Sequence, residues 1–283
     1  MNRVGYGAMR LAGPNVWGRP ADPEAARAML RSAVELGVTL FDTANAYGPR
    51  TVNQLIGEAL KPWPEGVIVG NKVGAGRGPD RSWILTHHPG TVRRQVHEAL
   101  TDMGTEASEL TYLRLAGDTP GVGSEVPLED ALGVLVELRE QGLVRRIGLS
   151  GASPEMLARA QRMTPIAAVQ NRFNLLDRSG VQVLAACEAQ GILFVPYFPL
   201  GAGRLTDFVE LLAPARRLGA TPAQVALGWL LRRSPAVVVI PGTADPGHLR
   251  SNVAAAGVAD RLTDAEVARL TALADESKAT LGA

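Results

Sequence analysis

Three side chains with acid–base chemistry follow two apolar runs in the first third of the chain. Asp42 comes directly after the run Val38–Phe41, Tyr47 stands in the loop that follows, and Lys72 comes after the run Val67–Val69. A buried lysine cation lowers the pKa of a nearby tyrosine, and a carboxylate keeps that lysine charged. The tyrosine then passes a proton near neutral pH, so the three residue types together indicate proton transfer.

Both apolar runs are typical of buried parallel strands, and residues 54–60 between them favour a helix. Asp42 and Lys72 would then lie at the C-terminal ends of neighbouring strands, the rim where barrel enzymes place their chemistry. The alternative is that Asp42 caps a turn, Lys72 is solvated and Tyr47 packs against the rim. The order and spacing of the three residues favour the chemical interpretation.

The sequence motifs around these residues indicate a protein family more specifically than the residue types alone do. Gly-Tyr-Gly-Ala-Met-Arg-Leu near the N-terminus and Phe-Asp-Thr-Ala-Asn-Ala-Tyr-Gly around Asp42 and Tyr47 resemble the aldo-keto reductases, and the resemblance covers essentially the whole chain. It implies an NADPH-dependent carbonyl reductase in which Asp42, Tyr47 and Lys72 are three members of a catalytic tetrad, with Tyr47 as the proton donor.

Strand-like and helical segments alternate from end to end, which predicts an α/β protein with a parallel sheet and right-handed crossovers. We expect one (β/α)8 TIM barrel domain over residues 1–283. An open doubly wound sheet is the alternative, but no Gly-rich phosphate loop of Rossmann form follows the first strand. The further expected strands are Leu110–Leu115, Ile147–Ser150, Ala168–Asn171, Ile192–Pro196 and Val237–Ile240, with an eighth near Val4–Met9. The further expected helices are Pro23–Leu36, Pro89–Met103, Leu128–Gln141, Pro154–Met163, Ser179–Gln190, Pro222–Arg233, Gly247–Ala256 and one opened by the capping box at Thr263. Loops are expected over Val73–His88 and Gly117–Pro127 and from Phe198 onward.

Composition narrows the class of protein. The chain has 283 residues, 46% of them hydrophobic, and a net charge of +1 with interleaved signs, so we expect neither a nucleic-acid nor a membrane partner. A single cysteine, Cys187, excludes an internal disulfide framework and is expected in the core. Four scattered histidines give no metal-ligand spacing. With neither a signal peptide nor a long apolar run, we expect a cytoplasmic monomer or weak oligomer that acts on a small-molecule substrate.

The resemblance also implies which residues hold the nicotinamide cofactor. Ser150 and Gln170 match positions that bond the carboxamide, and Tyr197 matches the ring that stacks on the nicotinamide. Gly151 stands where the family has an amide side chain. Gly242 and His248 stand where it often has Lys and Arg on the 2′-phosphate, so NADPH is expected and NADH stays open. The remaining implied cofactor residues are Leu200, Thr243 and Asn252.

The fourth member of the tetrad departs from the family. Arg114 occupies the position of the catalytic histidine in Glu-Leu-Thr-Tyr-Leu-Arg. A guanidinium is always charged, donates in a planar fork and cannot give up a proton. We expect Arg114 to lower the pKa of Tyr47 further and to suit an anionic or conjugated substrate. In the alternative, Arg114 pairs with Glu109 or Asp118 and only supports the rim.

The predicted function is reduction of a polarised C=O, C=C or C=N by an atypical aldo-keto reductase. Trp17, Trp83 and His87 are the candidates for the substrate pocket, since they lie in loops near the expected rim. Two other functions stay open: a cofactor-binding regulatory protein with little turnover, and a redox-neutral elimination or cyclisation with a tyrosinate as the base. NADPH consumption separates the reductase from both.

Overall fold

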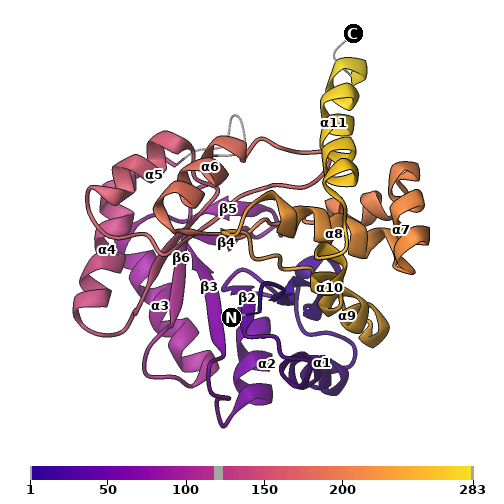
Figure 1. The fold of residues 1–283 in the computed structure, drawn as a ribbon. Helices are drawn as coiled ribbons and strands as arrows, with labels where there is room; N and C mark the ends of the chain where they lie inside the picture. The colour runs from indigo at the N-terminus through magenta and orange to yellow at the C-terminus, as the bar shows by residue number, and fades with distance from the viewer. Residues whose placement is uncertain (1, 118–123, 282–283) are drawn as a thin grey trace.

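Parallel strands form the centre of the molecule. The structure is a computed structural model that describes residues 2–117 and 124–281, and at 206–207 and 273–281 it describes the backbone only. Seven strands make one sheet in the order β1-β2-β3-β6-β7-β8-β9. Residues 237–239 link its two edges, because Val237 pairs with Phe194 and Val239 pairs with Val4 through isolated bridges. The sheet therefore closes into the predicted (β/α)8 barrel, with helices α1 to α6 around the strands in Figure 1.

The bounds of the elements agree with the expected alternation. The strands are β1 Tyr6–Gly7, β2 Leu40–Ala44, β3 Ile68–Val73, β4 Ala75–Arg77, β5 Trp83–Leu85, β6 Leu110–Arg114, β7 Ile147–Ser150, β8 Ala168–Gln170 and β9 Leu193–Phe194. The helices are α1 Pro23–Glu35, α2 Thr51–Leu60, α3 Pro89–Met103, α4 Leu128–Glu140, α5 Pro154–Gln161, α6 Val181–Gln190, α7 Leu212–Leu218, α8 Pro222–Arg233, α9 Pro246–Val253, α10 Ala255–Ala259 and α11 Asp264–Leu281.

Local capping explains where several helices begin. The side chains of Asp22, Ser153, Thr221 and Asp245 each accept the backbone N–H three residues on, and each is followed by a proline at the first helical position. The capping box predicted at Thr263 is present, since Thr263 and Glu266 exchange side-chain to backbone hydrogen bonds. α11 projects beyond the barrel in Figure 1.

Three expectations about the chain between these elements are wrong. The predicted loop 73–88 contains the antiparallel hairpin β4–β5, and the loop after Phe198 contains α7. The strand predicted at Val237–Ile240 is confirmed in part, because Val237 and Val239 bridge the two edges of the sheet and residues 236–239 exchange backbone hydrogen bonds with both. The predicted last barrel helix divides into α9 and α10. Most of the predicted loop 117–127 lies outside the described residues.

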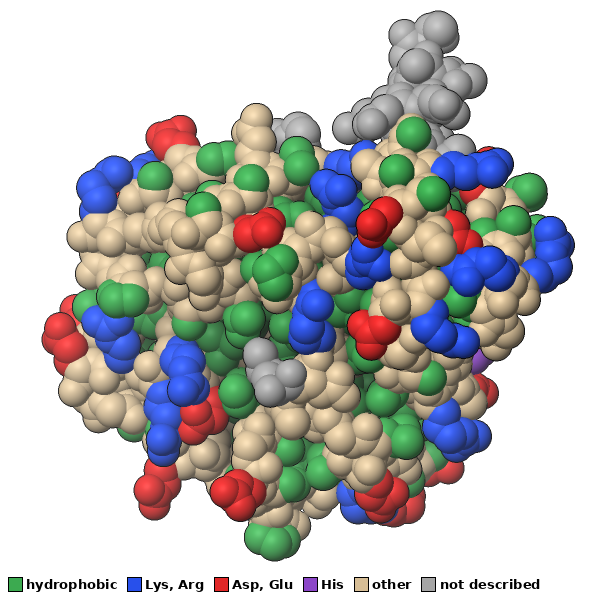
Figure 2. Space-filling model, in the orientation of Figure 1, with side chains coloured by type: hydrophobic (Ala, Val, Ile, Leu, Met, Phe, Trp, Pro, Cys, Tyr) green, Lys and Arg blue, Asp and Glu red, His purple; other side chains and the backbone are tan. Residues whose placement is uncertain are grey.

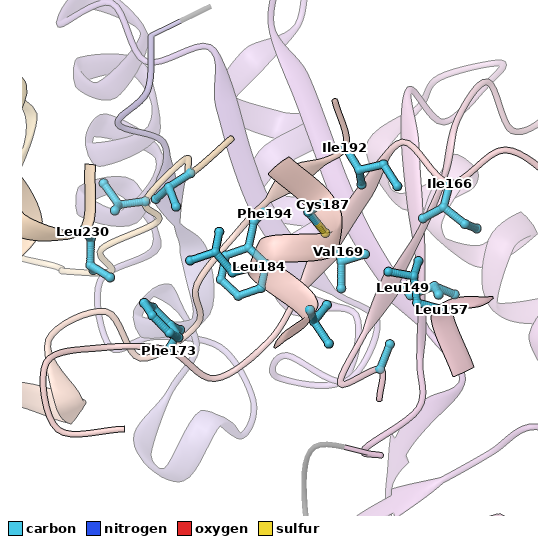
Figure 3. Close-up of a cluster of buried hydrophobic side chains, with 14 of the residues drawn as sticks. Leu149, Leu157, Ile166, Val169, Phe173, Leu184, Cys187, Ile192, Phe194 and Leu230 are labelled. Carbon is cyan, nitrogen blue, oxygen red and sulfur yellow. The ribbon is translucent and has the colours of Figure 1, made fainter. Parts of the chain in front are cut away.

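The largest apolar cluster joins the second half of the barrel to its helices. Cys187 lies in this cluster with Val169, Leu184 and Ile192, as Figure 3 shows. It is fully buried, and burial raises its pKa to about 12, which confirms the expected core role. On the surface, Figure 2 shows Lys and Arg interspersed with Asp and Glu over the face drawn. None of the described helices is long and apolar enough to cross a membrane.

Candidate active site

The three predicted proton-transfer residues meet inside the C-terminal rim of the barrel. β2 and β3 run side by side, with Ala44 opposite Lys72. The Lys72 Nζ lies 2.6 and 2.7 Å from the two carboxylate oxygens of Asp42 and 3.3 Å from the Tyr47 hydroxyl. Both charged side chains are less than 9% exposed. A buried ion pair thus supports a tyrosine hydroxyl at one point on the rim.

The electrostatics of this group depart from the expectation for Tyr47. Burial raises the pKa of Tyr47 above its ordinary value, and the nearby cations Lys72 and Arg114 oppose that rise only in part. Lys72 and Arg114 each act to lower the pKa, as predicted, but the predicted net lowering is wrong because burial outweighs them. Burial acts to lower the pKa of Lys72, but Asp42 and Tyr47 outweigh it and raise the value. Tyr47 keeps its proton and Lys72 its charge at neutral pH.

A glutamine from the far side of the barrel completes the Asp42 environment. The Gln170 Nε2 donates to Asp42 Oδ1 at 2.8 Å, although the two residues are 128 positions apart. Its Oε1 is buried and has no hydrogen-bond partner among the described residues. Gln170 therefore fixes the carboxylate and leaves one acceptor at the site.

Buried amides support the loop that carries Tyr47. Asn53 donates to Asn45 and Asn71, Asn71 donates to Asn45, and Asn45 donates to the Gln95 carbonyl at 2.8 Å. Thr43 completes this network by donating to Asn53 at 2.8 Å. These amide side chains join β2, α2, β3 and α3, so they tie the Tyr47 loop to the strand that carries Lys72.

Arg114 ends β6 and stands on the same rim. Its Nη1 donates to the Ser150 hydroxyl at 3.0 Å, and its guanidinium carbon lies 5.1 Å from the centroid of the Tyr197 ring. Glu109 pairs instead with Arg145 and Arg146, and Asp118 lies outside the described residues. Within the described part of the chain, Arg114 has no carboxylate partner.

One cavity of about 830 Å³ begins at these residues and runs toward α9. It brings together most of the predicted residues. Its walls include Asp42, Tyr47, Lys72, Arg114, Gln170, Tyr197, Leu200, Gly242, Thr243, His248 and Asn252, together with Arg10, Trp83, Ile84, Phe198 and Ser251. A space of this size at the C-terminal ends of the strands is where a barrel binds its ligands.

The predicted cofactor residues occupy different parts of this cavity. Gln170 and Tyr197 lie near Tyr47, while Ser150 is fully buried beneath Arg114 and is not among the lining residues. A Cβ added at Gly242 would lie 2.6 Å from the Gly7 carbonyl, so this position has no room for a side chain. Arg10, which sequence reasoning missed, lies against Gly242 and lines the cavity there.

Only one of the three candidates for the substrate pocket lines the cavity. Trp83 lines the cavity, and its ring meets the Tyr47 ring edge-on at 6.2 Å between centroids. His87 is buried, and its Nε2 contacts the Arg114 carbonyl, so it supports β6 from behind the cavity. Trp17 lies against Arg77 and Arg81 and is not among the lining residues. No group of three or more metal-ligating side chains occurs in the described chain.

The barrel has counterparts among known proteins. Residues 3–275 match the Aldo/keto reductase family. The chain therefore belongs to this family and is an oxidoreductase of the aldo-keto reductase class, as its sequence predicted.

Particular relatives cover nearly the whole chain. It is 43% identical to pyridoxine 4-dehydrogenase of Escherichia coli over 90% of its own length and 89% of that protein. It is 36% identical to an uncharacterised oxidoreductase of Schizosaccharomyces pombe, over 91% and 82% of the two chains. Among solved structures, a Klebsiella pneumoniae aldo-keto reductase in complex with NADPH superposes with a TM-score of 0.79 at 25% identity, covering 96% and 90% of the chains. A thermostable aldo-keto reductase solved with epalrestat gives 0.84 at 28% identity, covering 96% and 95%.

Proposed function

We propose that this protein is an NADPH-dependent reductase of small aromatic aldehydes, with the aldehyde of pyridoxine as the first substrate to test. The observation that carries the proposal is the Tyr47 hydroxyl, which stands at the cavity wall 3.3 Å from a lysine held charged by Asp42. Tyr47 gives its proton to the carbonyl oxygen while a hydride reaches the carbonyl carbon, so an aldehyde becomes a primary alcohol. The similarity to pyridoxine 4-dehydrogenase supports this substrate class.

The residues along the cavity fit a nicotinamide dinucleotide. The free Oε1 of Gln170 matches the N–H of a carboxamide, and the aromatic ring of Tyr197 lines the same cavity. The close approach of Gly7 and Gly242 leaves the groove beside Thr243 and Asn252 open to phosphate groups. When bound there, NADPH supplies the hydride, and the Klebsiella pneumoniae relative solved with NADPH supports this cofactor.

Arg114 selects the substrate in this proposal. Its guanidinium lines the cavity beside Tyr47 and lacks a carboxylate partner in the described chain. A fork of N–H donors binds an ionised oxygen better than it binds a neutral ketone. An aromatic aldehyde with an ionised hydroxyl next to the carbonyl, as in the pyridoxine series, brings such an oxygen to the reacting group.

The raised pKa of Tyr47 argues against the redox-neutral alternative. An elimination or cyclisation with Tyr47 as the base needs a tyrosinate at neutral pH, and burial keeps this hydroxyl protonated. The site is therefore better suited to donate a proton than to remove one.

The test is NADPH oxidation by the purified protein with pyridoxal, benzaldehyde, a short aliphatic aldehyde and a conjugated enone. We expect turnover with pyridoxal above the other three, and Tyr47→Phe as the matched inactive control. Binding of NADPH without its oxidation by any member of the panel contradicts the reductase and points to a regulatory cofactor-binding protein. Faster turnover of the enone moves the chemistry to C=C reduction.

A further inference from the structure

An arginine contacts two indole rings, one of which lines the cavity. The guanidinium carbon of Arg77 is 4.4 Å from the centroid of Trp83 and 5.5 Å from the centroid of Trp17. Arg81 adds a second cation 5.2 Å from Trp17. Arg77 and Trp83 are opposite each other in the β4–β5 hairpin, whereas Trp17 belongs to the loop after β1. The stack of Trp17, Arg77 and Trp83, called the clamp below, therefore joins two separate loops.

The hydrogen bonds of Arg77 fix the backbone on both sides of the clamp. Its Nη1 and Nη2 donate to the carbonyls of Val16 and Asn15 at 3.0 and 3.2 Å, and its Nε and Nη2 donate to the Arg81 carbonyl at 2.9 and 2.7 Å. Asn15, Val16 and Arg81 all have positive φ, at 57°, 58° and 66°. A β-branched residue such as Val16 is rarely found there, so the arginine fork holds two turns, one of which contains an unfavourable backbone conformation.

The clamp also reaches the proton donor. The Val16 carbonyl that accepts from Arg77 accepts from the Gly48 N–H as well, at 3.1 Å, and Gly48 follows Tyr47 directly. Trp83 meets the Tyr47 ring edge-on at 85° and lines the cavity while 52% of it stays exposed. An exposed indole on a short hairpin is free to turn unless its neighbours hold it. Arg77 covers Trp83 at 4.4 Å, while Tyr47 meets the same ring edge-on.

We propose that Arg77 is a positioning residue that fixes Trp83 as a wall of the substrate pocket and so gives the site its preference for flat aromatic substrates. This inference rests on the proposed reductase function and adds to it the part of the pocket that selects ring shape. Arg77 acts through Trp83, because its side-chain hydrogen bonds go to backbone carbonyls and it is not among the residues that line the cavity. A fixed indole offers a face on which an aromatic ring stacks, and a short aliphatic aldehyde gains little from it.

A double-mutant cycle tests the inference. Arg77→Leu, Trp83→Ala and the double variant are compared with wild type on pyridoxal and on a short aliphatic aldehyde. We expect Arg77→Leu to raise KM for pyridoxal about 10-fold with kcat within about 3-fold, since uniform binding is lost, and to change the aliphatic KM much less. In the Trp83→Ala background the same substitution should have almost no further effect on KM, because the two residues act as one unit.

Two further variants separate positioning from stability. Arg77→Lys keeps the positive charge without the fork and should recover only part of the pocket. Arg94→Leu, on the exposed face of α3 with its side chain 61% exposed, should leave both KM values unchanged. The inference is overturned if Arg77→Leu lowers the melting temperature but leaves the pyridoxal KM at its wild-type value. It is also overturned if the effects of Arg77→Leu and Trp83→Ala simply add.

A binding measurement keeps this result distinct from failure of the proposed function. Quenching of tryptophan emission by pyridoxal gives a dissociation constant without any turnover. If wild type oxidises no NADPH, the reductase proposal fails, and the clamp then stands or falls on whether Arg77→Leu weakens this binding about as much as Trp83→Ala does. Equal binding by wild type and Arg77→Leu excludes a positioning role for Arg77.

Discussion

Two cations end neighbouring strands of this barrel, and their surroundings differ. Lys72 on β3 contacts both oxygens of Asp42 and the Tyr47 hydroxyl, and it is 8% exposed. Arg114 on β6 is half-buried, donates to the neutral Ser150 hydroxyl and lies beside the Tyr197 ring. The charge of Lys72 is matched by the Asp42 carboxylate, which forms a buried ion pair with it. Arg114 has no carboxylate partner within the described chain.

The difference separates the fixed part of the chemistry from its selectivity. A buried cation with a carboxylate partner keeps one geometry and one protonation state, which suits it to support a proton donor. A half-buried guanidinium without such a partner has donors left for a ligand. In the proposed function, Lys72 therefore supports Tyr47 and Arg114 is available to the substrate.

The largest effect is expected at Tyr47, which the matched cation supports. Tyr47→Phe removes the hydroxyl and its proton but keeps the ring that packs on Trp83. We expect kcat for aldehyde reduction to fall about 10²- to 10⁴-fold, the usual contribution of a general acid. NADPH binding, followed by fluorescence, should stay close to wild type. Turnover that survives this substitution would mean that another group gives the proton.

Breaking the matched pair should cost stability as well as activity. Lys72→Met leaves the Asp42 carboxylate buried without its cation, and we expect the free energy of unfolding to fall by about 3–5 kcal/mol. The double variant Asp42→Asn with Lys72→Met should recover most of this loss, because no unpaired charge is then buried. Urea denaturation measures both. Arg31→Met, which opens an exposed pair with Glu24, is the control and should leave stability nearly unchanged.

This matched pair was predictable from sequence, because each member comes within three residues of an apolar run and the ends of parallel strands meet at one rim. What could not be predicted depends on contacts between distant segments. Gln170 reaches Asp42 across 128 residues. The direction of the Tyr47 pKa depends on how deeply the ring is buried, which three residue names do not determine. The hairpin that carries Trp83 was missed because β4 and β5 are only three residues each.

At the unmatched cation, substitution should change selectivity more than catalysis. Arg114→Met is expected to raise KM for carboxybenzaldehyde or pyridoxal about 10- to 100-fold, the value of a hydrogen bond to a charged group, and to change KM for benzaldehyde little. Arg114→Lys keeps the charge without the fork and should lie between the two. If Arg114→Met raises KM equally for charged and neutral aldehydes, Arg114 only supports the rim. The proposed contrast between Arg114 and Lys72 is then wrong.

The pH dependence of reduction measures how both cations affect the pKa of Tyr47. The pKa of Tyr47 lies above its ordinary value of 10.0, because burial outweighs the opposing effects of Lys72 and Arg114. A proton donor is active below its pKa, so kcat should stay level through neutral pH and fall only as the pH rises above 10. In Arg114→Met one opposing cation is gone, and the falling limb should move to higher pH. A limb centred near neutral pH would contradict the raised value.

The smallest effect is expected at a third cation, Arg10, which extends the comparison to the other end of the cavity. Its Cγ lies 3.8 Å from the place a Gly242 Cβ would take, and the arginine has no ion-pair partner in the described chain. Arg10 thus resembles Arg114 in being available to a ligand, and it lies against Gly242, one of the two positions where the resemblance implies a contact with the 2′-phosphate. Arg10→Ala should weaken NADPH binding about 3- to 5-fold, since an exposed ion pair contributes little, and weaken NADH binding less.

Raising the ionic strength should reduce the difference, because salt screens an exposed charge. Arg19→Ala, at an exposed pair with Glu58, is the control. Equal weakening of both dinucleotides would place Arg10 at a phosphate that the two share.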